Sequence, residues 1–500
     1  MLALTVRTRI GLDSAIAMFR SGLLDTLSDH RSGAQSPVPG SPGTVQYRVP
    51  GYNLKYHHTM HRLSCAVQRY AWGKVGSASV VAQLGELNGD VTVDAETPYA
   101  EYWFGTHHAG PASVRAVDGS GSMALGVWLK LNQDTALGNL PSRPDCVMDD
   151  EFCGLPYLAK VLSVAKCLSI QAHPDKALAE RLHAERPEIY KDPNHKPEMA
   201  LALTPFEAMC GFRSVSEILH FIDTVPEFRA VLLWQGEGSD GSRAIAELRQ
   251  AAAATGGGSD GLSGPLQNLF RVYANADPAK VAAQVDTLTA RVGTDAPGSS
   301  AHSHSQDLSD PSGSSLAEGL AVRLAGQFPG DIGVFAPFLL NFLRLKPGDA
   351  IFLAANEPHA YVSGDCFEVM ANSNNVVRMG CTPKLRDVPV LTEMLTFSSG
   401  LPNVLNGNAV DENVRVYTPT DPSVTEFQLE RVSLTSGEAC VLPPAETPSI
   451  IIIVDGAGRA SGAPVSRGQV YIQPANASLD FSVPESVGAS CLAFRVHCRE

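Results

Sequence analysis

The stretch from Ser169 to Lys176, which reads SIQAHPDK, constrains this chain more than any other part of it. Side chains alternate between the two faces of a β-strand, so Gln171 and His173 project to the same side. Pro174 and the two residues after it end the strand and open a helix, because proline suits an early helical position. His173 is thus placed as a metal ligand or a base. Gln171 alone is a weak indication, since glutamine is outside the usual ligand set for zinc, and an isolated pair of this kind is more often structural.

A second motif, DPNHKPE at residues 192–198, leads into another expected strand. In that strand Glu198, Ala200 and Ala202 share one face. A carboxylate among small residues inside a barrel is costly unless a charge or a metal pairs with it. Glu198 is therefore the natural third ligand of a site begun by Gln171 and His173.

A third motif delivers another histidine. A β pattern at 345–353 is followed by a turn through Asn356 to Pro358, and His359 comes directly after the turn. This arrangement can project an imidazole into the mouth of a barrel.

Composition narrows the classes of function. The chain has 500 residues, of which 44% are hydrophobic, so we expect a globular protein of two or three domains. No apolar run approaches the roughly 20 residues that a bilayer requires, and we expect a soluble protein without a membrane partner. The net charge of -14 argues against nucleic acid as a partner. An anionic substrate must then find a local basic pocket. Ten cysteines without a CxxC pair are typical of a reducing compartment, so we expect a cytoplasmic protein.

Hydrophobic patterning predicts a mainly β chain with a helical insertion. Short β-like runs are expected at Leu63–Gln68, Val91–Val93 and Ser113–Val117. Helical spacing appears at Lys176–Glu185 and in four segments of the middle third, Val215–Ile222, Arg243–Ala253, Pro278–Val292 and Leu316–Phe328. Two low-complexity stretches, at 256–259 and 293–315, interrupt these helices.

These patterns divide the chain into four parts. Residues 1–59 form a leader that we expect to be disordered or targeting, and import into an organelle is the alternative to a cytoplasmic location. Residues 60–205 together with 345–395 form the first β domain, 206–344 form the helical insertion, and 396–500 form a second β domain. The run Ser466–Ala475 echoes Lys346–Ala355 but lacks a histidine at its end. The second β domain is therefore interpreted as a metal-free copy of the first.

Taken together, the motifs resemble those of the type I mannose-6-phosphate isomerases (phosphomannose isomerases), zinc enzymes of the cupin superfamily. The resemblance runs from Met60 to Glu500. Its most specific parts are Tyr70–Lys74, Leu168–Lys176, Tyr190–Glu198, Phe328–Gly333, Glu357–Tyr361 and Asn375–Asp387. It implies a fold of two cupin-type jelly-roll barrels plus an α-helical domain.

The resemblance also implies a site. One zinc ion per chain is expected, and the positions that match the family's ligands are Gln171, His173, Glu198 and His359. The family's catalytic arginine matches Arg378, and its phosphate contacts match Ser169, Lys160 and Lys384. One departure is visible, because the family has Ser-Asp-Asn where this chain has Ser373-Asn374-Asn375. If the family's aspartate orients the arginine, Asn374 removes a charge-assisted hydrogen bond to Arg378.

The implied reaction interconverts mannose 6-phosphate and fructose 6-phosphate through an enediol(ate), and so supplies mannose for GDP-mannose. A zinc ion can stabilise the developing oxyanion as a Lewis acid, and Arg378 adds a fixed positive charge. The proton carrier is left open between Glu368, Lys196 and zinc-bound water. We expect a monomer whose partner is a small sugar phosphate. The alternatives are a non-catalytic metal-binding cupin that binds sugar phosphate, and a cupin oxygenase, which the glutamine ligand disfavours.

Overall fold

The structure is a computed structural model, and it describes residues 60–140, 153–255, 261–293, 299 and 314–499. The leader predicted at 1–59 and most of the stretch at 293–315 lie outside the described residues. All described residues belong to one compact unit. None of the helices in the described ranges combines the length and the apolar character that crossing a bilayer requires.

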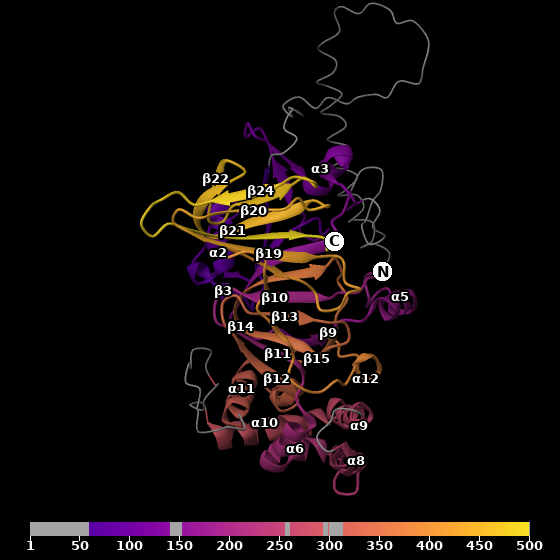
Figure 1. Ribbon diagram of the computed structural model, residues 1–500. Coiled ribbons are helices and arrows are strands. Elements are labelled where there is room, and N and C mark those ends of the chain that lie inside the picture. Colours follow the sequence, from indigo (N-terminus) through magenta and orange to yellow (C-terminus); the bar gives the residue numbers. More distant parts are fainter. Residues whose placement is uncertain (1–59, 141–152, 256–260, 294–298, 300–313, 500) are drawn as a thin grey trace, which may run out of the picture. The chain divides into compact units, whose positions relative to one another are not determined.

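An antiparallel sheet of eleven strands forms the middle of this unit (Figure 1). Its strands are β2 (Ala66–Gln68), β5 (Glu101–Phe104), β8 (Tyr157–Val164), β9 (Ile170–Ala172), β10 (Glu198–Ala202), β11 (Phe206–Phe212), β12 (Leu340–Leu345), β13 (Ala350–Leu353), β14 (His359–Ala371), β15 (Val377–Gly380) and β16 (Val404–Leu405). Strand β14 organises the sheet. Its first half pairs with β9 and β11, and its second half pairs with β8 and β10. One long strand thus connects the elements that carry the three predicted site motifs.

A second antiparallel sheet has twelve strands. These are β1 (His61–Ser64), β6 (Ser113–Arg115), β7 (Ser122–Ala124), β17 (Asn408–Ala409), β18 (Val414–Tyr417), β19 (Gln428–Thr435), β20 (Ala439–Leu442), β21 (Ser449–Ala460), β22 (Ala463–Ser466), β23 (Val470–Gln473), β24 (Leu479–Ser482) and β25 (Ser490–His497). The division into domains made from the sequence remains a prediction. Strand β1 pairs with β23 and β6 pairs with β1, so early residues that were assigned to the first β domain also build the C-terminal sheet.

The two sheets share a hydrophobic core. Met199 and Phe367 from the first sheet are buried in one cluster with Ile450 and Phe494 from the second. The rings of Phe367 and Phe494 stack with their centroids 4.8 Å apart. The opposite face of the first sheet lines the barrel interior, where Ala200 and other small or apolar side chains are buried.

Helices cover the outer face of β11 and the start of β14, and in Figure 1 they gather at the side of the first sheet away from the C-terminal strands. They are α6 (Val215–Thr224), α7 (Pro226–Leu232), α8 (Asp240–Thr255), α9 (Ser263–Ala274), α10 (Pro278–Val292) and α11 (Ser314–Gln327). Their start sites follow from local chemistry: Pro278 occupies the first turn of α10, and the Asp277 side chain accepts two backbone N–H bonds there. The predicted β-rich fold with a helical insertion is confirmed.

Five further α-helices of the described residues belong to the β part: α2 (Val80–Asn88), α3 (Leu125–Leu131), α4 (Gln133–Ala136), α5 (Lys176–Glu185) and α12 (Val388–Met394). The prediction of a strand at Val91–Val93 is wrong. The backbone N–H groups of Val93 and Asp94 donate to the side chains of Glu86 and Tyr99 instead of to a neighbouring strand. The segment therefore runs as an irregular connection after α2.

The two echoing segments adopt the same turn. Asp349 N–H donates to the carbonyl of Lys346 at 2.9 Å, and Gln469 N–H donates to the carbonyl of Ser466 at 3.1 Å. In each turn the preceding glycine has a positive φ, 93° in the first and 88° in the second, which favours glycine. The side chain of each turn's last residue also accepts from the first residue's N–H, at 2.9 Å in both cases. The echo in the sequence thus corresponds to the same turn geometry in both sheets.

Candidate metal centre and its surroundings

Three buried atoms converge in the barrel interior. The Nε2 atoms of His173 and His359 lie 3.5 and 3.4 Å from Oε2 of Glu198. Each of the three atoms is shielded from solvent and has no hydrogen-bond partner among the described residues. Within the described residues these three side chains form the group of His, Cys, Asp and Glu that could hold a metal, with ligand atoms all within 4.8 Å of one another.

The tautomers of both histidines follow from their other ring nitrogen. Nδ1 of His173 lies 2.6 Å from the carbonyl oxygen of Asn375, and Nδ1 of His359 lies 3.0 Å from that of Glu357. A carbonyl oxygen only accepts, so each Nδ1 carries the proton and each Nε2 presents a lone pair. Burial lowers the pKa of His173 to about 4, which keeps its ring neutral.

Three lone pairs that face one another without a proton between them repel. Buried polar groups are almost always satisfied, and a cation bound by all three atoms satisfies this set. Two imidazoles and one carboxylate are donors that zinc prefers. The residues therefore fit the zinc ion predicted from the sequence.

Lys196 completes the pattern at Glu198. Its ammonium lies 2.8 Å from Oε1, so only Oε2 of the carboxylate is left for a metal. Burial alone favours the neutral acid, but Lys196 and the two imidazoles hold the pKa of Glu198 well below its usual range. The carboxylate is thus ionised, and it is oriented by Lys196, two positions earlier in the segment that leads into β10.

Gln171 lies beside these residues on β9. It pairs across the sheet with His359 on one side and with Arg378 on the other, and cross-strand partners project to the same face. Its Oε1 accepts a hydrogen bond from Ser169 Oγ at 3.2 Å. The structure thus places two more predicted site residues, Gln171 and Ser169, at the edge of the centre.

A second buried charged group belongs to the same sheet. The ammonium of Lys160 lies 2.9 Å from Oε2 of Glu368 and 3.6 Å from Oε2 of Glu101. Glu368 stands opposite Ala200 on the face that carries Glu198. Burial raises the pKa of Glu368, and the charge of Lys160 opposes that rise. Two carboxylates already share Lys160, so this residue is placed in the barrel interior rather than on an open phosphate site.

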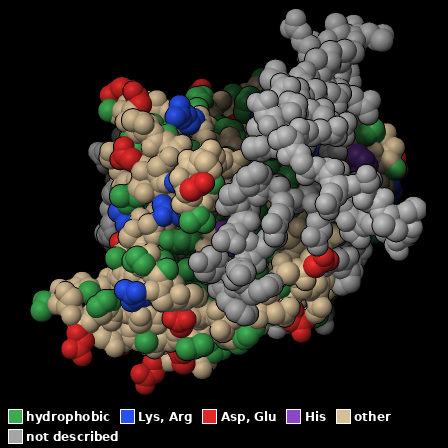
Figure 2. Space-filling view, turned by 90° about the horizontal axis from the view of Figure 1, so that it is seen from above, with side chains coloured by type: hydrophobic (Ala, Val, Ile, Leu, Met, Phe, Trp, Pro, Cys, Tyr) green, Lys and Arg blue, Asp and Glu red, His purple; other side chains and the backbone are tan. Residues whose placement is uncertain are grey.

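The two other predicted cations are unpaired. In the described part of the chain, no side chain or backbone group forms a hydrogen bond or an ion pair with the half-buried guanidinium of Arg378 or with the exposed ammonium of Lys384. Burial lowers the pKa of Arg378, but the group stays charged at neutral pH. Both cations are thus available to an anion. On the described surface in Figure 2, basic side chains are scattered among acidic ones, so an anion depends on such local cations for binding.

Sequence reasoning missed the role of Asp192. Its carboxylate accepts from Ser373 Oγ at 2.8 Å and from the N–H of Asn374 at 2.7 Å. The side-chain amide of Asn375 donates to the Asp192 carbonyl at 2.6 Å. These bonds hold the loop whose Asn375 carbonyl orients His173. In the sequence, the position of Asp192 inside the DPNHKPE motif could have indicated this role.

The departure at Asn374 acts on a different residue from the one expected. Oδ1 of Asn374 lies 3.2 Å from Nε2 of His107, and the described structure has no hydrogen bond between Asn374 and Arg378. His107 is buried against the edge of the Trp103 ring. Burial, with a smaller contribution from His108, lowers the pKa of His107 to about 4. The amide of Asn374 therefore faces a neutral imidazole.

Restoring the family's aspartate should change that imidazole. In Asn374→Asp a carboxylate replaces the amide beside His107, and an adjacent negative charge favours the protonated ring, so we expect the pKa of His107 to rise. An NMR titration of the His107 ring protons measures the shift. The exposed substitution Asn403→Asp serves as the control and should leave the His107 titration unchanged. An unchanged pKa in Asn374→Asp would show that the contact with His107 does not exist in solution.

Comparisons with known proteins agree on one family. Residues 60–215 match the family model of the phosphomannose isomerase type I catalytic domain, and residues 241–340 match that of its helical insertion domain. The chain is 38% identical over 426 residues to mannose-6-phosphate isomerase 1 of Arabidopsis thaliana, which covers 84% of this chain and 90% of that protein. It is 40% identical over 450 residues to the mannose-6-phosphate isomerase of Homo sapiens, covering 87% and 98% of the two chains.

A solved structure is also similar. The crystal structure of mannose 6-phosphate isomerase from Salmonella typhimurium, bound to fructose 6-phosphate as substrate and to zinc, superimposes with a TM-score of 0.67 at 26% identity. The similarity covers 88% of this chain and 100% of that one.

Proposed function

Because the chain belongs to the type I phosphomannose isomerase family, we propose that its buried donor set holds a zinc ion and that it interconverts mannose 6-phosphate and fructose 6-phosphate. The observation that carries this proposal is the convergence of three unpartnered ligand atoms, from His173, Glu198 and His359, beside the unpaired Arg378. Gln171, on the same face, is the fourth proposed ligand.

The reaction moves a proton between C2 and C1 of the sugar through an enediol(ate). Bound zinc supplies Lewis-acid stabilisation of the oxygen that becomes negative, and a ligand set with one carboxylate leaves the site with a net positive charge. The neutral amide of Gln171 suits this requirement, because a second carboxylate would cancel that charge.

Arg378 is proposed to stabilise the same negative charge. Its guanidinium is half-buried, has no described partner and lies across the sheet from Gln171. A fixed cation in a partly desolvated site acts more strongly on a developing charge than it would in water. We therefore assign to Arg378 the binding of the enediolate rather than of the ground-state sugar.

Two residues remain candidates for the proton transfer. Glu368 is buried and its pKa is raised, which brings a carboxyl group closer to the range where it can both take and give a proton. Lys196 is the alternative, but its ammonium is engaged with Oε1 of Glu198. The raised pKa favours Glu368 as the acid–base group, with Lys160 holding its carboxylate in place.

The phosphate end of the substrate is assigned to Lys384, with Ser169 as a second contact. Lys384 follows the turn at Thr382, whose Oγ1 accepts the N–H of Lys384 at 3.1 Å. Its side chain is exposed and unpaired among the described residues, so it can meet a dianion that the net charge of -14 otherwise repels. Lys160, which two carboxylates share, is a weaker candidate for this contact.

Removing the Lys384 ammonium should weaken substrate binding. A cation that holds the phosphate equally in the ground and transition states contributes to uniform binding, so Lys384→Ala should raise KM and change kcat little. Steady-state kinetics with mannose 6-phosphate measure both constants. The control is Lys346→Ala, which removes an exposed lysine from the turn before β13. An unchanged KM in Lys384→Ala would exclude the residue from the phosphate site.

An enzymatic assay tests the proposed function itself. Fructose 6-phosphate formed from mannose 6-phosphate is measured with a coupled assay, before and after treatment with a chelator and after zinc is added back. We expect turnover that the chelator abolishes and zinc restores. A non-catalytic cupin would bind the sugar phosphate without forming product, and that result would contradict the proposal. The monomeric state, the cytoplasmic location and the supply of GDP-mannose remain predictions.

A further inference from the structure

The C-terminal sheet contains a cavity of about 370 Å³ that the isomerase reaction does not use. Its lining consists of polar and apolar side chains from β17 to β20 and the segments beside them: Asn408, Val410, Asp411, Val414, Val416, Gln428, Glu430, Val441, Leu442 and Pro443. This volume falls within the range of small-molecule sites, which is about 300–1,000 Å³. The position of the cavity relative to the repeated strands indicates which class of ligand it can bind.

The strand pairing shows which residues of the two sheets correspond. After the repeated turn, Leu353 pairs with Glu198 in the first sheet, and Gln473 pairs with Ser449 in the second. Leu353 and Gln473 occupy the same place relative to the turn. Ser449 therefore stands where the first sheet has its metal-binding glutamate.

The other metal ligands are absent from the second sheet as well. Asn356, ten residues after Lys346, donates its N–H to the carbonyl of His173. Asn476, ten residues after Ser466, donates its N–H to the carbonyl of Ala445. Both asparagines have a left-handed backbone, with φ of 64° and 60°. Ala445 thus takes the place of His173. Leu479, three residues after Asn476, takes the place of His359.

The buried ion pair beside the centre is kept, but with its charges exchanged. In the first sheet Ala200 pairs with Glu368, which pairs with Lys160. In the second sheet Ile451 pairs with Arg495, which pairs with Glu430. Glu430 lines the cavity, so the cavity lies at the position that corresponds to the surroundings of the metal centre.

This exchange leaves no available cation in the cavity. The guanidinium of Arg495 donates twice to Glu430, and its Nη1 donates to the carbonyl of Pro443 at 2.8 Å. The described lining contains Asp411 and Glu430 but no lysine, arginine or histidine. The negative charges of Asp411 and Glu430 therefore disfavour a sugar phosphate here, whereas the positive charges of Arg378 and Lys384 favour one in the first sheet.

Two buried polar groups of this sheet are unused. Ser449 Oγ and His497 Nε2 have no hydrogen-bond partner within the described part of the chain, and both residues are at least 97% shielded from solvent. His497 pairs across the sheet with Gln428, and its Nε2 lies 3.7 Å from Oε1 of Glu430. The inner face of this sheet thus carries unpartnered polar groups among the apolar side chains, such as Val432 and Ile451, that fill its core.

We propose that this cavity binds an uncharged polyhydroxylated molecule, a free hexose or the corresponding polyol. Hydroxyl groups both donate and accept hydrogen bonds. The amides of Asn408 and Gln428 supply donors and acceptors, and the carboxylate of Asp411 supplies acceptors. The valine and leucine side chains of the lining match the C–H faces of such a ligand. The proposal does not depend on the identity of the substrate at the metal centre.

Saturation-transfer NMR with D-mannose and D-mannitol as probes tests the proposal on the zinc-loaded full chain. We expect saturable transfer to both probes. It should be lost in Val416→Trp, which fills the cavity, while isomerase activity is retained. Gln428→Ala should weaken binding by about 2- to 10-fold, the effect of one lost hydrogen bond. The control is Val487→Trp, an exposed position outside the lining.

Three results would overturn the proposal. The first is the absence of saturable transfer to either probe. The second is transfer that keeps its full affinity in Gln428→Ala and that persists in folded Val416→Trp. The third is transfer that mannose 6-phosphate abolishes in all variants alike, since the probes would then be binding at the metal centre. Gln428→Ala is a milder substitution than Val416→Trp, so it remains an independent test if Val416→Trp misfolds.

Discussion

His173→Ala and His359→Ala are each expected to lose zinc and turnover together while the protein stays folded. Each imidazole presents an Nε2 lone pair to the centre and none of its ring nitrogens serves the hydrophobic core. Removing one of them leaves a single imidazole with Glu198 and the proposed Gln171, a weaker donor set than the imidazoles and carboxylate that hold zinc in open, catalytic sites. Elemental analysis of the purified variants measures the zinc, and the coupled assay measures turnover.

A matched control is His220→Ala, which removes an exposed histidine from α6 in the helical insertion. It should retain zinc and activity, and circular dichroism of all three variants should be alike. Stoichiometric zinc in an active His359→Ala protein would remove this residue from the site.

Arg378→Ala is expected to lower kcat strongly and to leave zinc in place. Truncating one partner of a desolvated charge pair costs about 2–5 kcal/mol, or roughly 30- to several-thousand-fold. The loss should appear in kcat because the proposed partner is charge that develops at the enediolate, whereas Lys384→Ala should act on KM. Steady-state kinetics and elemental analysis on the same preparation separate the two effects.

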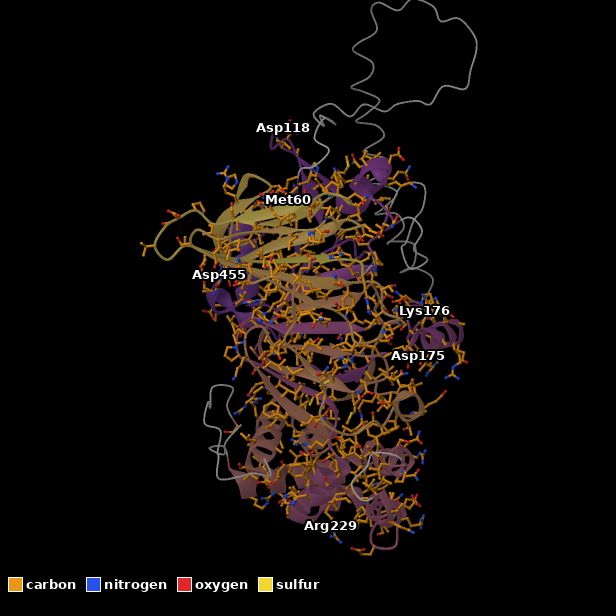
Figure 3. All side chains as sticks on the ribbon, in the orientation of Figure 1. Met60, Asp118, Asp175, Lys176, Arg229 and Asp455 are labelled. Carbon is orange, nitrogen blue, oxygen red and sulfur yellow. The ribbon has the colours of Figure 1, made fainter. Side chains whose placement is uncertain are left out.

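Two further variants sharpen this test. Arg378→Lys keeps the charge but loses the planar guanidinium, so partial recovery of kcat is expected. Arg229→Ala, at a position among the helices of the insertion in Figure 3, should match the unsubstituted protein. Normal kcat in Arg378→Ala would leave the residue with a structural or phosphate-binding role.

Local chemistry allowed much of the fold to be predicted. The helix expected at Lys176–Glu185 has those bounds, because Asp175 caps its first turn by accepting the N–H of Leu178. In Figure 3 Asp175 and Lys176 lie at the start of α5, which follows β9 after the short connection that holds His173. The helix at Pro278–Val292 also has the predicted bounds. The ligand motifs could be found for the same reason, since each places its residue at the end of a strand or a turn.

What the sequence did not indicate depends on contacts between distant segments. The pairing of β1 with β23 joins residues about four hundred positions apart, and no local pattern specifies such a register. Lys160 looked available to a phosphate until the pairing of β8 with β14 placed it against Glu368. The hydrogen bonds between Asp192 and the loop at 373–375, and the contact of Asn374 with His107, could not be predicted for the same reason.

The buried ion pair of the second sheet could not be predicted from the sequence for the same reason. Glu430 and Arg495 are far apart in the chain, and their correspondence to Lys160 and Glu368 follows only from strand pairing. The sequence echo covered the turn and one strand of each sheet. The cavity beside Glu430 became visible only once those strands were placed.

Anomalous diffraction at the zinc edge, on crystals of the active enzyme, locates the metal directly. We expect one zinc peak within about 2.0–2.2 Å of Nε2 of His173, Nε2 of His359 and Oε2 of Glu198, with Gln171 as the fourth protein ligand. A zinc peak elsewhere, or an active enzyme without zinc between these residues, would contradict it.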